Sequence, residues 1–179
     1  MNKLISIVIP AHNEEENIVT IFDRIAKVLL NLHYDYEILV VDDGGSDETL
    51  NIVKAIAQRN QRIFYIEFSR NFGHQPALKA GLDFAKGDCV ISLDADLQHP
   101  PELFVQMIQK WEEGFDVVYT RRKEDKSLSF KKRKSSLYFY KLLNSLSDIE
   151  LEPGTADFRL LDRTVVDVFK KYLITALLP

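Results

Sequence analysis

Short apolar runs alternate along this chain with longer stretches in which apolar residues recur every three or four positions. The runs are rich in β-branched residues and predict buried strands over 4–9, 36–41, 63–68, 88–93 and 117–120. The spaced apolar residues predict amphipathic helices over 14–30, 49–59, 73–86 and 101–111. Pro101 suits the first turn of the last of these helices, and Ser46 is a candidate N-cap for the second.

The regular alternation ends after residue 120. A basic segment over 121–134 precedes a predicted amphipathic helix over 135–147, a short strand over 157–161 and a last helix over 163–172. Alternation of strand and helix in the first 120 residues predicts an α/β fold. We expect a mainly parallel sheet flanked by helices, with right-handed crossovers between the strands.

Polar residues follow each of the first four predicted strands. The segments are Pro10-Ala11-His12-Asn13-Glu14, Asp42-Asp43-Gly44, Ser69-Arg70-Asn71-Phe72-Gly73 and Asp94-Ala95-Asp96. The carboxyl ends of parallel strands meet at one edge of a sheet, where open α/β sheets bind their ligands. The sequence therefore predicts one polar ligand site at that edge.

Asp94 and Asp96 are the candidate metal ligands. They alternate with Ala95, so in an extended chain both carboxylates point to the same side and can share a divalent cation, with Gln98 adding a neutral oxygen. Taken alone, the pair fits a helix cap or an acidic turn equally well. No glycine-rich phosphate-binding motif is present, so phosphates at this acid-rich edge would need a cation between them and the carboxylates.

Asp42 and Asp43 suit the other end of a nucleotide, where carboxylates accept hydrogen bonds from base N–H groups or ribose hydroxyls. The alternative is a turn before a capped helix. The four histidines, His12, His33, His74 and His99, do not cluster in any metal-ligand spacing.

Charge is unevenly distributed along the 179 residues. Segment 121–134 holds eight basic and two acidic residues, a charge of +6, which leaves −10 for the rest of a chain whose total is −4. This pattern favours one anionic partner at one place over nucleic-acid binding. The single cysteine, Cys89, cannot form an internal disulfide, as expected in a reducing cytosol.

The basic segment and the amphipathic helix after it suit a membrane surface, and a solvated loop before a core helix is the alternative. No apolar run has the length of a membrane span. The apolar end at Leu177-Leu178-Pro179 suggests a fragment of a longer protein. We expect the fragment to be soluble and the full-length protein to be anchored beyond residue 179 at the cytoplasmic face of the membrane.

Together the strand-end motifs resemble family 2 inverting glycosyltransferases of the GT-A fold, in particular bactoprenol glucosyltransferases and dolichol-phosphate mannose synthases. The motifs that carry the resemblance are Pro10-Ala11-His12-Asn13-Glu14, Val41-Asp42-Asp43-Gly44-Gly45-Ser46-Asp47, Ser69-Arg70-Asn71-Phe72-Gly73, Asp94-Ala95-Asp96-Leu97-Gln98 and Asp157-Phe158-Arg159. The resemblance covers nearly the whole chain. It departs at Gly45, where the family more often has serine.

The resemblance implies one catalytic domain over 1–179, with a nucleotide-sugar half over 1–120 and an acceptor half over 121–179. It implies a Mg²⁺ or Mn²⁺ site at Asp94, Asp96 and Gln98, with Asp96 and Asp157 as catalytic residues. The implied nucleotide-sugar residues are Pro10, Ala11, Asn13, Glu14, Asp42, Asp43, Arg70, Gly73, Asp94, Ala95 and Asp96. The implied acceptor-phosphate residues are Arg121, Arg122, Lys132, Arg133 and Ser136.

The expected activity is metal-dependent, inverting transfer of a hexose from a nucleotide sugar to polyprenyl phosphate at a membrane surface, with UDP-glucose favoured over GDP-mannose. Two alternatives stay open: a saccharide hydroxyl as acceptor, and a non-catalytic nucleotide-binding module. With a phosphate acceptor Asp157 would orient the acceptor, whereas with a hydroxyl acceptor it must act as base. A homo-oligomer also stays open.

Overall fold

A computed structural model of the chain describes residues 3–30, 32–121 and 155–176. Two compact units make up the chain, one of Met1–Val118 with Asp157–Pro179 and the other of Tyr119–Ala156. Most of the second unit lies outside the described residues, and so does the predicted helix over 135–147. The division into a nucleotide-sugar half and an acceptor half stays a prediction.

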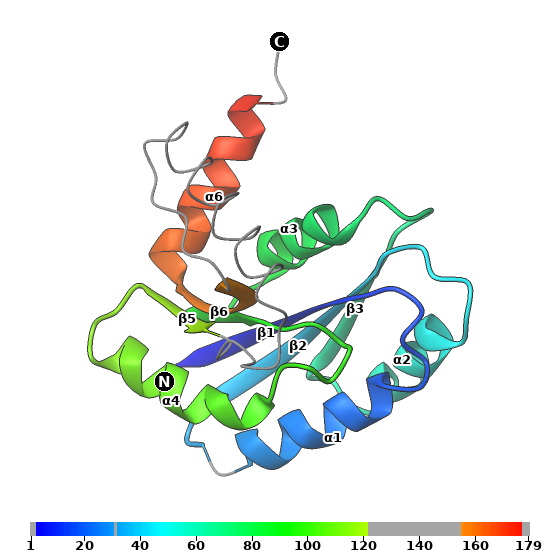
Figure 1. Cartoon of the computed structure of the whole chain (residues 1–179), viewed down its shortest axis with the longest axis horizontal. Coiled ribbons are helices and arrows are strands. Elements are labelled where there is room, and N and C mark those ends of the chain that lie inside the picture. The colour runs from blue at the N-terminus through cyan, green and yellow to red at the C-terminus, as the bar shows by residue number, and fades with distance from the viewer. Residues whose placement is uncertain (1–2, 31, 122–154, 177–179) are drawn as a thin grey trace, which may run out of the picture. The chain divides into compact units, whose positions relative to one another are not determined.

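Six strands form one mixed, mostly parallel sheet in the order β3-β2-β1-β4-β6-β5 (Figure 1). The strands are β1 (Leu4–Ala11), β2 (Asp35–Asp42), β3 (Ile63–Glu67), β4 (Cys89–Ser92), β5 (Val117–Arg121) and β6 (Thr155–Asp162). Strand β1 pairs in parallel with β2 and β4, and β2 pairs in parallel with β3. The predicted α/β fold is confirmed. The antiparallel pairing of β6 with β4 had no signal in the sequence.

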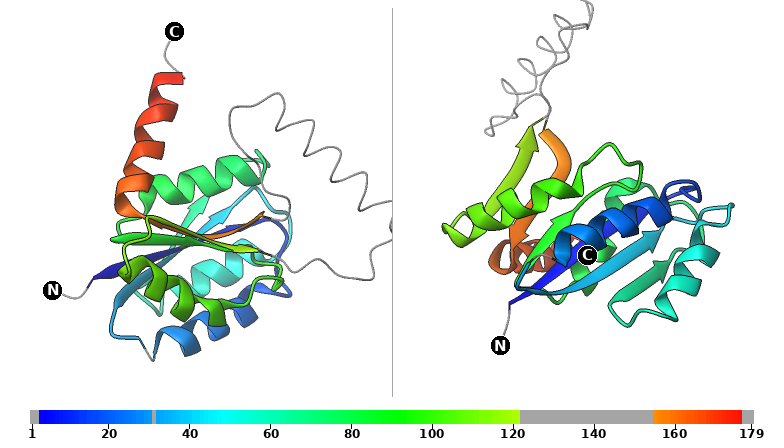
Figure 2. Two further views of the ribbon diagram at one scale, coloured as in Figure 1. Left: turned by 60° about the vertical axis from the view of Figure 1, so that its left-hand side comes forward. Right: turned by 90° about the horizontal axis from the view of Figure 1, so that it is seen from below.

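Helices cover both faces of this sheet, which explains why its central strands are continuous apolar runs. Helices α3 (His74–Phe84) and α6 (Arg163–Ala176) lie on one face, and α1 (Ile18–Leu29), α2 (Thr49–Ala57) and α4 (Phe104–Glu112) lie on the other (Figures 1 and 2). A short 3-10 helix, η1 (Pro101–Leu103), precedes α4. Gly81 lets α3 approach the sheet, because a Cβ there would lie 2.2 Å from a methyl carbon of Val8.

Two local predictions were wrong. Helix α1 begins at Ile18 rather than residue 14, because the carbonyl of Glu14 accepts the N–H groups of Asn17 and Ile18 in a turn. Ser46 does not cap α2. The N-cap residue is Glu48, whose side chain makes no capping hydrogen bond, and the Asp47 carboxylate before it accepts the N–H of Thr49 at 3.0 Å.

At the amino edge of the sheet, buried polar groups satisfy one another. Glu37 on β2 accepts hydrogen bonds from the Ser6 hydroxyl at 2.6 Å and from the Lys86 N–H at 2.7 Å. The same Ser6 oxygen accepts the N–H of Gly87 at 2.7 Å. Burial raises the pKa of the nearby Cys89 thiol to about 12, as expected for a core residue. None of the helices described is long and apolar enough to cross a membrane.

Candidate active site

A cavity of about 320 Å³ lies at the carboxyl edge of the sheet. Residues that follow β1, β2, β3 and β4 contribute to its wall, together with the first turns of α3. Its lining consists of Pro10, Ala11, His12, Glu14, Asp43, Asn71, Gly73, His74, Ala77, Asp94, Ala95 and Asp96. Four segments far apart in the sequence thus meet at the edge where the strand-end pattern predicts a ligand site.

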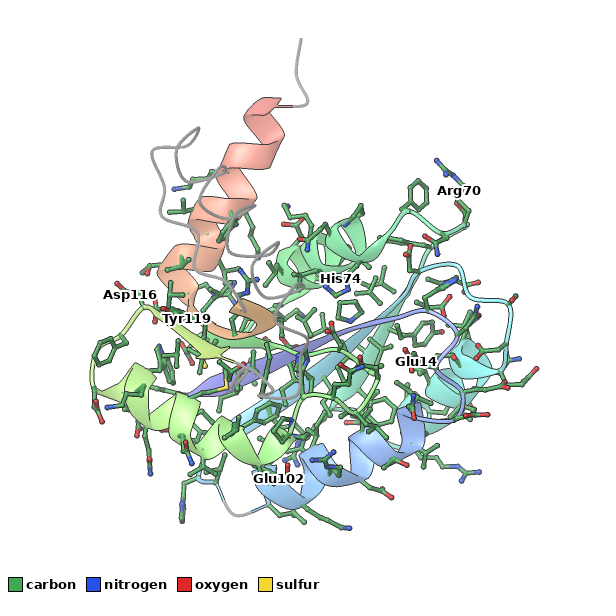
Figure 3. All side chains as sticks on the ribbon, in the orientation of Figure 1. Glu14, Arg70, His74, Glu102, Asp116 and Tyr119 are labelled. Carbon is green, nitrogen blue, oxygen red and sulfur yellow. The ribbon has the colours of Figure 1, made fainter. Side chains whose placement is uncertain are left out.

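Most of the predicted nucleotide-sugar residues line this cavity, and three do not. Pro10, Ala11, Glu14, Asp43, Gly73, Asp94, Ala95 and Asp96 line it, whereas Asn13, Asp42 and Arg70 do not. Arg70 is exposed and its guanidinium lies 4.2 Å from the ring centre of Phe72. Figure 3 shows Arg70 at the outer end of its loop, away from Glu14 and His74.

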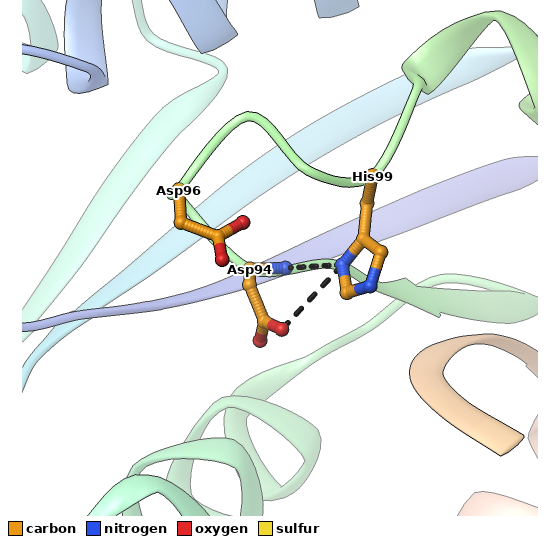
Figure 4. Close-up of side chains that lie close together, drawn as sticks. All are labelled: Asp94, Asp96 and His99. Atoms are coloured by element: carbon orange, nitrogen blue, oxygen red, sulfur yellow. Dashed lines mark hydrogen bonds and ion pairs between the residues drawn. The ribbon is translucent and has the colours of Figure 1, made fainter. Parts of the chain in front are cut away.

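The acidic end of the cavity can accommodate a cation. Asp94, Asp96 and His99 each offer one ligand atom, and these atoms lie within 4.8 Å of one another (Figure 4). Carboxylate oxygens are the ligands that Mg²⁺ and Mn²⁺ prefer, so the chemistry of the donor set fits such an ion. Gln98 is exposed and its N–H donates to Asp96 at 3.0 Å. Ligation by the Gln98 side chain stays a prediction.

His99 contacts Asp94 but does not line the cavity. Its ring is 4% exposed and stacks on Phe158, with the ring centres 5.2 Å apart. The His99 Nδ1 accepts the Asp94 N–H at 3.3 Å and lies 3.5 Å from an Asp94 carboxylate oxygen. On the other side of this carboxylate, the His74 Nε2 lies 3.7 Å from its second oxygen. Two histidines therefore flank Asp94, although neither showed a ligand spacing in the sequence.

A second part of the cavity wall, around Asp43, is held by hydrogen bonds. Both oxygens of Asp43 are engaged, since they accept the N–H groups of Phe72 at 2.7 Å and Gly73 at 2.8 Å. The His12 Nδ1 lies 2.9 Å from the Asp43 carbonyl oxygen, and its Nε2 lies 3.1 Å from the Asn71 amide nitrogen. Asp43 therefore holds the loop that follows β3.

Asp42 is the last residue of β2 and is buried beside this wall. It is 2% exposed, and its Oδ1 has no hydrogen-bond partner, while Oδ2 accepts the N–H of Gly45 at 3.2 Å. Burial raises the pKa of the Asp42 carboxyl, against the opposing effect of the Gly45 hydrogen bond. An unpartnered buried carboxylate oxygen is costly, so it marks a position that packing alone does not explain.

The loops at this edge adopt unusual backbone conformations. Asn13 and Leu97 both have positive φ angles, of 57° and 61°, although neither is glycine. Gly44 has a φ of 63°, and a Cβ there would lie 2.2 Å from the backbone of Arg70. For residues other than glycine, such conformations cost on the order of 1 kcal/mol and cluster at functional sites. Glycine and, less strongly, asparagine suit positive φ angles, so Gly44 and Asn13 carry a sequence signal for this conformation and Leu97 does not.

The acceptor side is less fully described. Asp157 lies on β6 and Arg121 is the last residue of β5, and the structure describes the backbone of both residues but not their side chains. Arg122, Lys132, Arg133 and Ser136 lie outside the described residues. The roles assigned to these residues stay predictions.

A second cavity, of about 620 Å³, lies between α3 and α6. Leu78, Leu82, Leu161 and Phe169 are among its lining residues, and none of the predicted site residues lines it. The smaller cavity is therefore the candidate active site.

Sequence reasoning missed four residues of the active-site cavity: His12, Asn71, His74 and Ala77. His12 and Asn71 lie inside two of the strand-end motifs, so their place after a strand could have predicted that they line the cavity. His74 begins α3 directly after Gly73 and had no comparable signal.

Comparison with known proteins gives one consistent family. Residues 6–169 match the family described as Glycosyl transferase family 2. The chain is 44% identical over 167 residues to an uncharacterised glycosyltransferase of Synechocystis, covering 93% of this chain and 52% of that protein. It is 40% identical over 166 residues to a prophage bactoprenol glucosyl transferase homologue of Escherichia coli, covering 93% and 54%.

Among solved structures, the chain resembles glucosyl-3-phosphoglycerate synthase from Mycobacterium tuberculosis. The TM-score is 0.61 at 25% identity, and the match covers 91% of this chain and 58% of that one. That structure contains Mn²⁺, UDP and glucosyl-3-phosphoglycerate. The chain spans about half the length of the curated relatives that it matches.

Proposed function

The chain belongs to glycosyl transferase family 2 and has the GT-A fold, and we propose that it moves a hexose from a nucleotide sugar to polyprenyl phosphate. UDP-glucose is the favoured donor, and the reaction takes place at the cytoplasmic face of a membrane. The observation that carries the proposal is the cavity at the carboxyl edge of the sheet, with Asp94 and Asp96 on its wall. The names of the bactoprenol glucosyl transferase relatives support the acceptor.

Asp94 and Asp96 would hold the Mg²⁺ or Mn²⁺ ion, with Gln98 as the further ligand that the family resemblance implies. When bound, the ion stabilises negative charge that develops on the departing diphosphate. His99 holds the Asp94 backbone and His74 lies beside its carboxylate, so the cation ligand is positioned before the donor arrives. The Mn²⁺ and UDP bound by the mycobacterial synthase support this assignment.

In the proposed reaction, an acceptor phosphate oxygen forms a bond to the anomeric carbon while the bond from that carbon to the diphosphate oxygen breaks. Attack from the opposite face inverts the configuration. A phosphate oxygen is already ionised, so no proton needs to be removed, and Asp157 orients the acceptor. Arg121, Arg122, Lys132 and Arg133, with Ser136, would bind its phosphate by charge-assisted hydrogen bonds.

Thermal melting tests the donor half of the proposal. A ligand that binds only the folded protein raises its Tm. We expect UDP and UDP-glucose with Mn²⁺ or Mg²⁺ to raise the Tm more than GDP and GDP-mannose do, and more than either nucleotide without a cation. An equal or larger response to GDP would overturn the base assignment. No response to any nucleotide would overturn the nucleotide site.

Transfer of labelled glucose tests the acceptor half. We expect transfer to undecaprenyl phosphate in detergent, and none to a soluble oligosaccharide. Reversing the charges of Lys131–Lys134 should lower the rate on the lipid phosphate, whereas reversing Lys27 and Lys54, on helices α1 and α2, should not. An unchanged rate after the first reversal, or faster transfer to the oligosaccharide, would contradict a lipid-phosphate acceptor.

A further inference from the structure

We propose that His12 is a positioning residue that shapes the nucleotide end of the cavity through one neutral tautomer. The residues concerned form the His12 cluster: His12 after β1, Asp43 after β2 and Asn71 after β3. All three line the cavity. The inference rests on the proposed function, because it assigns the cluster to the donor nucleotide.

The tautomer follows from the two partners of the ring. The Asp43 carbonyl oxygen can only accept a hydrogen bond, so the Nδ1 that lies 2.9 Å from it carries the proton. The Asn71 amide nitrogen, 3.1 Å from Nε2, can only donate, so Nε2 is the acceptor. The Asn13 amide nitrogen lies 3.4 Å from the same Nε2. His12 thus connects an acceptor after β2 to donors after β1 and β3.

The cluster also continues into the neighbouring loops. The Asp43 carboxylate binds the N–H groups of Phe72 and Gly73, directly before helix α3. The Asn13 side-chain oxygen accepts the N–H of Ser46 at 2.8 Å, in the turn before α2. Three loops that are separate in the sequence are therefore held in one arrangement at the cavity.

The position of the cluster favours a functional role over a structural one. His12 is exposed, and the strands before these loops are already paired with one another by their backbones. Losing contacts at an exposed ring should therefore change the stability little. The same loss would let the loops rearrange, and the donor would have to order them on binding.

Three variants separate the two ring nitrogens. His12→Asn places an amide near the Nδ1 position and keeps the Asp43 contact, whereas His12→Gln reaches the Nε2 position and keeps the Asn71 contact. His12→Phe keeps a flat ring and loses both. We expect each lost hydrogen bond to weaken binding of UDP with Mn²⁺ by about 2- to 10-fold, so that His12→Phe has the largest effect.

Two readouts distinguish positioning from a general loss of structure. Binding of Mn²⁺ without nucleotide should stay unchanged, because the hydrogen bonds of the His12 ring go to Asp43, Asn13 and Asn71 and none goes to Asp94 or Asp96. The Tm should stay close to that of the wild type. Asn71→Ala should weaken UDP binding in the wild type but add little in the His12→Phe background, since contacting residues are coupled. His33→Phe, at an exposed histidine before β2, is the matched control and should change nothing.

Wild-type affinity for UDP in His12→Phe would overturn the inference, as would fully additive losses in the double variant. A joint fall in Tm and in Mn²⁺ binding would assign His12 a purely structural role. A wild-type protein that binds neither UDP nor GDP would instead overturn the proposed function, and the inference with it.

Discussion

Strand β2 carries two buried carboxylates whose surroundings differ. Glu37, near its amino end, is 6% exposed and accepts hydrogen bonds from the Ser6 hydroxyl and the Lys86 N–H. Asp42, at its carboxyl end, is 2% exposed and has one oxygen without a partner. Both hydrogen bonds of Glu37 come from neighbouring groups of the fold, whereas Asp42 keeps a buried oxygen whose lost hydration no hydrogen bond replaces.

The same difference separates the two edges of the sheet. At the amino edge, the described polar groups around Glu37 complete one another's hydrogen bonds, which is the pattern of a structural network. At the carboxyl edge, Asp42, Asp94 and Asp96 bring negative charge to one region, with an unpartnered oxygen and loops of positive φ. The unpartnered oxygen and the positive φ angles both lower the stability of the folded chain, which suggests that this edge is organised to bind a ligand.

The largest expected effect is at Asp94. Asp94→Asn keeps the side-chain shape and removes the charge that would bind a cation, so glycosyl transfer should fall by about 10²- to 10³-fold. Titration calorimetry should show weaker Mn²⁺ binding, with little change in Tm. Asp83→Asn, which removes an exposed acid paired with Lys79 on α3, is the control. Unchanged Mn²⁺ affinity in Asp94→Asn would remove the metal assignment.

Asp42→Asn should move stability and affinity in opposite directions. Removing a buried charge should raise the free energy of unfolding by about 1 kcal/mol. If Asp42 belongs to the nucleotide site, as the family resemblance implies, UDP affinity should fall by about 10-fold or more. Denaturant titration and calorimetry measure the two effects, and Asp35→Asn, at the exposed start of the same strand, is the control. A variant with unchanged affinity would limit Asp42 to a structural role.

Glu37→Ala should lower the stability and leave the UDP affinity unchanged. It leaves the buried Ser6 hydroxyl and the partly buried Lys86 N–H without their acceptor, so the free energy of unfolding should fall by about 1–3 kcal/mol. For a chain of this size, each kcal/mol lowers the Tm by about 2–4 °C. Glu37→Gln retains an acceptor oxygen and should lose less. Below the melting transition UDP affinity should equal that of the wild type, and a lower affinity would break the contrast between the two edges.

The smallest effect concerns pH. Because burial raises the pKa of Asp42 in the folded state, the folded protein binds more protons than the unfolded one as the pH falls toward that pKa. The penalty of the buried charge is therefore fully present at pH 7 and fades on acidification. The stability advantage of Asp42→Asn over the wild type should shrink between pH 7 and about pH 4. Melting curves across this range check the sign, and an advantage that grows on acidification would contradict it.

Much of the fold was predictable because its signals are local. The apolar runs became β1 to β4, and the spaced apolar residues of α1, such as Ile18, Ile21 and Ile25, are buried as their periodicity indicates. The start of α1 was not predictable from periodicity, because the Glu14 turn replaces its first residues. The antiparallel pairing of β6 with β4 depends on contacts between distant segments, for which a single sequence carries no pattern.

By itself, the sequence determined the order of strands and helices and the placing of polar residues after four strands, because hydrophobic periodicity and turn residues act over short distances. Only the tertiary structure decided what those polar residues do. In it, the Asp43 carboxylate accepts hydrogen bonds from the Phe72–Gly73 backbone, the His99 ring accepts the Asp94 N–H, and the His12 ring contacts the Asn71 amide. These contacts depend on the register of strands that are far apart in the chain. A shift of one residue between paired strands would displace the loops that follow them by about 3.3 Å relative to one another, enough to break these hydrogen bonds.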